Sequence, residues 1–127
     1  MLERRLISTG SPFEERAGYS RALIKGDWCF VAGTTGYDYD TMRMPHDTAE
    51  QTRNAMKTIE NTLKEAGFAL SDVVRVVYYI TNPGFSDDVI AVVGELFRDI
   101  RPAATMVVTD LIKSEMKVEI EVTAFRG

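Results

Sequence analysis

The sequence predicts a single α+β domain in which one mixed sheet carries two helices on one of its faces. Two segments have the apolar spacing of amphipathic helices, and six shorter segments are rich in β-branched and aromatic residues. These segments follow one another in the order β-β-β-α-β-α-β-β. A chain of 127 residues is long enough for one hydrophobic core, and no repeat or linker divides it, so residues 1–127 are expected to form one domain.

Three strands are expected before the first helix. The first lies near Glu3–Ile7, and the segment after it, Ser8–Ala17, is expected to be irregular because it contains glycine, proline and charges. Tyr19–Lys25 and Trp28–Gly33 are apolar and are the next two strands. Between them, Gly26-Asp27 suits the tight turn of a hairpin.

The first helix follows a long loop, from Thr35 to about Pro45, that has no periodicity. Asp47 is in position to cap this helix, and Glu50 completes the pattern of a capping box. Gly67 is expected to end the helix in the left-handed conformation. One face of the helix is apolar and consists of Ala49, Ala55, Met56, Ile59, Leu63 and Ala66.

The second half of the chain begins with the strand Val73–Ile80. Ser86 is expected to cap the second helix, and Arg101-Pro102 to end it, because the residue before a proline avoids the helical conformation. Two further strands, Ala104–Thr109 and Lys117–Phe125, complete the sheet.

Two of the strands are apolar on both faces. In Val73–Ile80, the alternation sets Val73, Val77 and Tyr79 against Val74, Val76, Tyr78 and Ile80, and Trp28–Gly33 behaves in the same way. Two helices cover only one face of the sheet, and leaving the other in water forfeits several kcal/mol at about 25 cal/mol per Å². We therefore expect a homo-oligomer that buries the second face; the alternative is that the N-terminal segment and the 35–45 loop fold over it.

Composition excludes several classes of function. With 15 Lys and Arg against 19 Asp and Glu, the net charge of −4 disfavours binding to the phosphate backbone of nucleic acids. No apolar segment is long enough to span a membrane, and the N-terminus lacks the features of a signal peptide. A single cysteine forms no internal disulfide, so a cytoplasmic location is expected, with neither a membrane nor a nucleic acid as partner.

Few side chains suit chemistry. His46 is the only histidine, which excludes Ser-His-Asp and Cys-His catalysis and histidine-rich metal sites, and no metal or cofactor is expected. Cys29 lies among apolar neighbours and is interpreted as a buried thiol. Gly33 and Gly36 do not precede a helix in the manner of a phosphate-binding loop.

Glu119 is the best candidate for a catalytic residue. It lies on the sheet face that the helices leave uncovered, where burial would raise the pKa of its carboxyl towards a range useful for proton transfer. The alternative is a structural ion pair across an interface, and Glu121 on the same face competes for either role. Tyr19, before a strand, and Arg101, between helix and strand, are the other polar candidates; ordinary packing and a solvated charge are their alternatives.

The order and spacing of six motifs resemble the YjgF/Rid (reactive intermediate deaminase) family, also called the L-PSP endoribonuclease-like family. The resemblance covers Ser11 to Phe125. The motifs are Gly18-Tyr19-Ser20-Arg21-Ala22; Gly26-Asp27 with Phe30-Val31-Ala32-Gly33; Gln51-Thr52 through Ile59-Glu60-Asn61 to Leu63 and Ala66-Gly67; Leu70-Ser71-Asp72-Val73-Val74; Arg101-Pro102-Ala103; and Lys117-Val118-Glu119-Ile120-Glu121.

The resemblance implies a chorismate-mutase-like fold and a homotrimer with ligand clefts between subunits. The well-known members hydrolyse imines and enamines to a keto acid and ammonia, with an arginine that holds the substrate carboxylate and a glutamate that orients water. Ribonuclease activity, also attached to the family by name, is disfavoured by the single histidine and the negative charge.

Carried over by position, the resemblance makes Glu119 the water-orienting glutamate and Tyr19 and Gly33 cleft residues, while Thr105 and Met106 line the cleft with their backbone. The sequence departs from the family where Ala104 replaces the arginine of Pro-Ala-Arg-Ser/Thr. It therefore resembles a divergent branch, and Arg101, three residues before Ala104, is the candidate for a substitute anchor. The expected function is hydrolytic deamination of a small imine, enamine or related carbonyl compound; the alternative is a non-catalytic, ligand-binding or regulatory trimer.

Overall fold

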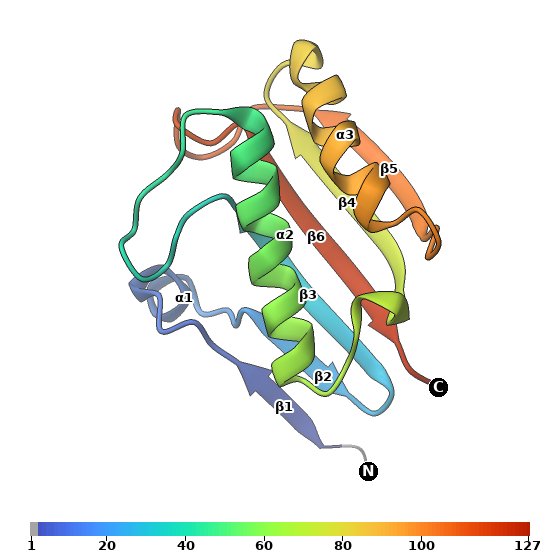
Figure 1. The fold of residues 1–127 in the computed structure, drawn as a ribbon. Coiled ribbons are helices and arrows are strands. Elements are labelled where there is room, and N and C mark those ends of the chain that lie inside the picture. The colour runs from blue at the N-terminus through green and yellow to red at the C-terminus, as the bar shows by residue number, and fades with distance from the viewer. Residues whose placement is uncertain (1–2) are drawn as a thin grey trace.

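A six-stranded sheet with two long helices lying across one face forms the body of the molecule (Figure 1). This computed structural model describes residues 3–127. The strand order is β1-β2-β3-β6-β4-β5; β4 and β5 run parallel, and the other neighbours run antiparallel. The strands are β1 (Arg4–Ile7), β2 (Ala22–Lys25), β3 (Trp28–Thr35), β4 (Val73–Ile80), β5 (Ala103–Val108) and β6 (Val118–Phe125).

The longest helix, α2, spans Thr48–Glu65 and begins as its sequence predicts. The Asp47 carboxylate accepts a hydrogen bond from the Glu50 backbone N–H at 3.0 Å, and Gly67 just beyond the helix has a φ of +86°. The other α-helices are α1 (Pro12–Ala17) and α3 (Ser86–Leu96), and the short 3₁₀ turns are η1 (Leu70–Asp72) and η2 (Pro83–Phe85). From residue 3 to 127, no helix has the length and apolar character needed to cross a bilayer.

The expectation that Ser8–Ala17 is irregular was wrong, because its second half forms α1. Proline is tolerated in the first turn of a helix, where its missing N–H would have no partner in any case. Pro12 occupies that turn, and the Ser11 side chain caps the helix by accepting from the Phe13 N–H at 3.2 Å. The helix ends at Gly18, which has a φ of +73°.

Both ends of α3 differ from the prediction. The turn η2 precedes the helix, so Phe85 occupies the capping position without a side-chain hydrogen bond, and Ser86 is already helical. At the other end the helix stops at Leu96 rather than Arg101. Beyond Leu96 the chain continues in a turn, in which the backbone oxygen of buried Phe97 accepts hydrogen bonds from the Ile100 and Arg101 N–H groups. Arg101 then enters the left-handed region with a φ of +54° before Pro102.

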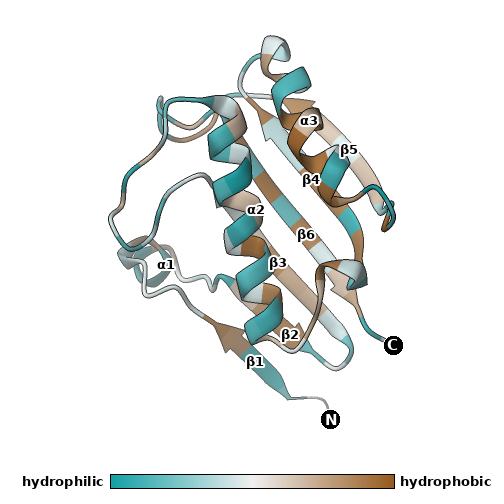
Figure 2. Ribbon diagram, in the orientation of Figure 1, coloured by the Kyte–Doolittle hydropathy of each residue, from teal (hydrophilic) through white to brown (hydrophobic). Residues whose placement is uncertain are grey.

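The core lies between the helices and the sheet. Buried side chains from β3, β4 and β6 pack there against the apolar face of α2 and against α3. Bands of hydrophobic and hydrophilic colour along β6 show the expected alternation (Figure 2). Two assignments were wrong, because a register shift lies between Val73 and Arg75. Val73 is buried with the core and does not share a face with Val77 and Tyr79, and Val74 is 43% exposed, unlike the buried Val76 and Tyr78.

The face of the sheet opposite the helices is largely uncovered, and we call it the open face. An aromatic cluster of Trp28, Phe30 and Phe125 lies on it, and these side chains are 42%, 47% and 37% exposed. The Trp28 ring centroid lies 6.1 Å from that of Phe30 and 4.5 Å from that of Phe125. In the described chain, neither the N-terminal segment nor the 35–45 loop buries this cluster.

The predicted fold class is confirmed, with α1 added to the expected order of elements. The predicted loop begins one residue later than expected, because β3 extends to Thr35, and it contains one isolated bridge between Asp38 and Arg43.

Candidate functional site

Three of the predicted site residues meet in a small pocket of about 90 Å³. Tyr19 reaches it from the turn after α1, Gly33 from the end of β3 and Glu119 from the start of β6. Tyr37 and Tyr39 from the loop after β3 and Met116 from the segment before β6 complete part of its wall. The pocket therefore gathers residues that are far apart in the sequence around one carboxylate.

A register shift in β3 brings Gly33 next to Glu119. Val31 pairs with Val122 and Thr34 with Ile120, so Ala32 and Gly33 together face a single residue of β6. A Cβ atom on Gly33 would lie 2.8 Å from Cδ and 2.9 Å from Oε1 of Glu119. The Glu119 carboxyl group therefore occupies the space that a side chain at position 33 would need.

Burial raises the pKa of the Glu119 carboxyl above its ordinary value of 4.5. The guanidinium of Arg21 opposes this rise, and the Glu121 carboxylate adds to it. A carboxylate with a raised pKa is a stronger base than a solvated one, so this environment suits a group that accepts a proton from water.

Arg21 is a site residue that our sequence analysis missed. Its side chain is only 1% exposed and lines the same pocket as Glu119. Nη1 donates to the Tyr39 hydroxyl at 3.1 Å, and Nη2 donates to the Gly33 carbonyl oxygen at 2.8 Å. The alternation along β2 could have indicated this position. Arg21 shares a face with Leu23, and this face is opposite to the one that carries the buried Ala22 and Ile24.

The remaining predicted residues lie elsewhere in the same chain. Arg101 is exposed in the turn before β5, where its Nη1 donates to the backbone carbonyl oxygen of Arg98, three residues earlier. Thr105 accepts a hydrogen bond from Arg75 at 3.0 Å, and the Met106 side chain packs against the core. Strand β4 separates β5 from β6, so one chain does not bring these three residues to Glu119.

Other reactive side chains lie in structural settings. Cys29 is fully buried, and burial raises the pKa of its thiol to about 11. His46 is exposed, and its backbone oxygen accepts a hydrogen bond from Lys117. Between residues 3 and 127, the structure contains no group of three or more His, Cys, Asp or Glu side chains placed to hold a metal ion.

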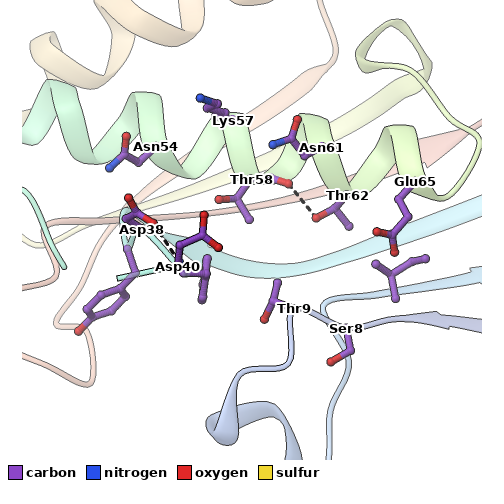
Figure 3. A pocket seen from close by; sticks show the side chains of 13 residues that line it. Ser8, Thr9, Asp38, Asp40, Asn54, Lys57, Thr58, Asn61, Thr62 and Glu65 are labelled. Atoms are coloured by element: carbon purple, nitrogen blue, oxygen red, sulfur yellow. Dashed lines mark hydrogen bonds between the residues drawn. The ribbon is translucent and has the colours of Figure 1, made fainter. Parts of the chain in front are cut away.

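A larger hollow of about 410 Å³ lies between α2 and the loop after β3 (Figure 3). Asn54, Lys57 and Asn61 reach it from α2, and Asp38 and Asp40 reach it from the loop. Tyr37 and Tyr39 line both this hollow and the Glu119 pocket, so the loop separates the two. The predicted site residues all lie outside this hollow.

Replacing Gly33 with alanine should cost activity and leave the fold nearly intact. The new methyl group would displace the end of a flexible side chain, the Glu119 carboxyl, and a shift of about 1 Å at a catalytic group costs roughly 100-fold in rate. Gly36→Ala is the matched control, because its Cβ would lie 2.6 Å from the Gln51 Cα in α2. That variant should lose roughly 1–3 kcal/mol of stability instead. Thermal unfolding measures the stability of both variants, and an activity assay compares Gly33→Ala with wild type. Equal destabilisation of the two variants would contradict the prediction.

Comparison with known proteins identifies relatives over nearly the whole chain. The family model described as Endoribonuclease L-PSP matches residues 9–126. An uncharacterized protein of Streptomyces coelicolor is 36% identical over 124 residues, which cover 97% of this chain and 92% of that protein. A RutC family protein of Pyrococcus abyssi is 31% identical over 109 residues, 85% of this chain and 86% of that protein.

Comparison with solved structures points to the same family. Rv2704 from Mycobacterium tuberculosis, a member of the YjgF/YER057c/UK114 family, has a TM-score of 0.89 and 42% identity, over 98% of this chain and all of that one. The YjgF gene product of E. coli has a TM-score of 0.82 at 21% identity, over 96% and 94% of the two chains, and so shares the fold. The family resemblance of the motifs is thus confirmed, and the chain belongs to the YjgF/Rid family, whose model is Endoribonuclease L-PSP.

Proposed function

We propose that this chain forms a homotrimer whose intersubunit clefts hydrolyse a small imine or enamine to a carbonyl compound and ammonia, with Glu119 as the group that orients water. The observation that carries the proposal is the half-buried Glu119 carboxyl with a raised pKa, lodged over Gly33 in a pocket beside Tyr19. Such a group is suited to deprotonate a water molecule held next to an electrophilic carbon.

The open face supports the oligomeric part of this proposal. Trp28, Phe30 and Phe125 leave an apolar surface that a second copy would bury. Packing copies on this face also gives the residues of β5, among them Thr105, a route to the Glu119 pocket of a neighbour, which the strand order denies them within one chain. The assembly and the cleft are therefore parts of one proposal.

The chemistry needs one water molecule. The water oxygen attacks the carbon of the C=N bond while the Glu119 carboxylate accepts one of its protons, and the electron pair of the double bond moves to nitrogen. Glu119 returns that proton to nitrogen, which gives a neutral carbinolamine. Glu119 then accepts the proton of the carbinolamine hydroxyl and passes it to nitrogen, so the C–N bond breaks with ammonia as the leaving group while the carbonyl forms. Water and imine yield a carbonyl compound and ammonia, and Glu119 ends in its starting state.

A second candidate, a trimer that binds a metabolite without turning it over, is favoured by one observation. Position 104, where the deaminase branch has its arginine, carries an alanine, which is exposed on edge strand β5. An alanine side chain forms no charge-assisted hydrogen bond with a carboxylate, so the affinity expected of that arginine is absent at this position.

Release of ammonia and keto acid from freshly generated 2-iminopropionate tests the proposed activity. We expect wild type to exceed the buffer rate and Ala104→Arg to exceed wild type by about tenfold, because the exposed edge position accommodates the longer side chain. Ala91→Arg is the control; Ala91 is also exposed but lies on α3 in the helix layer, so the same substitution there should gain nothing. If wild type and Ala104→Arg both stay at the buffer rate, hydrolysis of simple imino acids is excluded.

A further inference from the structure

The fully buried guanidinium of Arg21 is a charge whose hydrogen-bond partners are both neutral oxygens, on Tyr39 and Gly33. A guanidinium has five N–H donors, and these two bonds use two of them. Nε is buried, and among residues 3–127 it has no hydrogen-bond acceptor. Burying a charge without an opposite charge in direct contact is costly. The Arg21 guanidinium therefore has a positive charge and unused N–H donors with which it can bind an anion.

The pocket that Arg21 lines has the charge to receive one. Among its lining residues, Arg21 and Lys113 are cationic and Glu119 is acidic. The rings of Phe13 and Tyr19 contribute apolar wall, packed edge to face with centroids 6.1 Å apart. This combination fits a small anion with a short carbon skeleton better than it fits a cation or a nucleotide.

We propose that Arg21 binds the carboxylate of a small 2-imino or 2-oxo acid in this pocket and takes the role of the arginine that Ala104 replaces. The inference rests on the proposed function and adds to it the group that holds the substrate. Charge-assisted hydrogen bonds are roughly twice as strong as neutral ones, so a carboxylate displaces the Tyr39 hydroxyl from the guanidinium. Tyr39 lies in the loop after β3, so it moves aside without breaking a strand ladder.

Anchoring at Arg21 also places the reacting carbon. Gly33 lies between the two charged groups, because its carbonyl oxygen accepts from Arg21 and its α-carbon faces the Glu119 carboxyl. In a 2-imino acid the electrophilic carbon is bonded directly to the carboxylate carbon. A carboxylate held at Arg21 therefore brings that carbon next to the base that deprotonates water.

Equilibrium binding of pyruvate and of its neutral amide, pyruvamide, to wild type and to Arg21→Gln tests the proposal. Glutamine keeps an N–H donor for the Gly33 carbonyl oxygen and removes the charge. We expect Arg21→Gln to weaken pyruvate binding roughly 10- to 100-fold and to leave pyruvamide binding within about twofold of wild type. Equal loss for both compounds, unchanged pyruvate affinity, or a wild type that does not prefer pyruvate would overturn the proposal.

Two further variants keep the test decisive. Tyr39→Phe removes the competing hydroxyl and should bind pyruvate at least as tightly as wild type; a loss there would mean that Arg21 acts only by holding the loop. If Arg21→Gln does not fold, Arg21→Lys replaces it, since lysine keeps the charge without the fork and should lose pyruvate affinity selectively.

The binding assay is independent of turnover. Selective pyruvate binding through Arg21 without hydrolysis of 2-iminopropionate would refute the proposed deaminase and keep the anchor. Hydrolysis by Arg21→Gln with the wild-type KM would support the proposed deaminase activity and refute the role of Arg21 in binding the substrate carboxylate.

Discussion

Replacing Phe30 with glutamate is expected to separate the assembly into single chains. Phe30 is 47% exposed in the described chain and lies in the aromatic cluster of the open face, beside Trp28. In the proposed assembly a carboxylate there would be buried without a partner, which costs about 3–5 kcal/mol at each interface. Sedimentation velocity of the variant should show one folded species with the mass of a single chain.

Ile90→Glu is the control for this experiment. Ile90 is 53% exposed, but it lies on α3, in the helix layer on the opposite side of the sheet. The same change of charge at this position should leave the mass of the assembly at the wild-type value. A Phe30→Glu protein with the wild-type mass would show that the open face is not the interface.

Replacing Glu119 with glutamine should abolish most of the activity and stabilise the fold at neutral pH. Removing a positioned general base costs roughly 10²- to 10⁴-fold in rate. The stability effect follows from the raised pKa of the Glu119 carboxyl, which means that the folded chain binds this proton more tightly than the unfolded chain. Wild-type stability is therefore lost as the pH rises from about 4.5 through the folded pKa, whereas glutamine does not titrate.

Denaturant unfolding of both proteins at one chain concentration, over a series of pH values, measures this effect. The stability advantage of Glu119→Gln should be small below pH 4.5 and reach its maximum above the raised pKa. Full activity in the variant would remove Glu119 from the mechanism. A variant less stable than wild type at neutral pH would show that Glu119 serves as a structural ion pair.

Much of the fold was predictable because local signals and the final packing agree. Asp47 caps α2 and Gly67 follows its end, as their positions in the sequence indicate. The error at α1 came from treating Pro12 as a breaker, although a serine directly before a proline is also the signature of a helix start. The early end of α3 was missed because Pro102 sets only the latest point at which the helix can end, and residues 97–100 contain no proline or glycine to mark the turn.

The candidate site was predictable only in part. Tyr19, Gly33 and Glu119 meet as their motifs suggest, but their meeting depends on the register shift in β3. Gly33 was the available signal for this shift, because an isolated glycine inside a strand often marks a bulge. Arg21 was missed because a lone arginine at the start of a strand is ordinarily solvated, and only the closed packing of the neighbouring loop shows it to be buried.

The central claim is that the open face of the sheet is buried between copies of the chain, which also forms the cleft around Glu119. Sedimentation equilibrium of the wild-type protein at micromolar concentration tests it most directly. We predict a single species with three times the 14.2 kDa mass of one chain. A stable, folded protein of 14.2 kDa under those conditions would contradict the account.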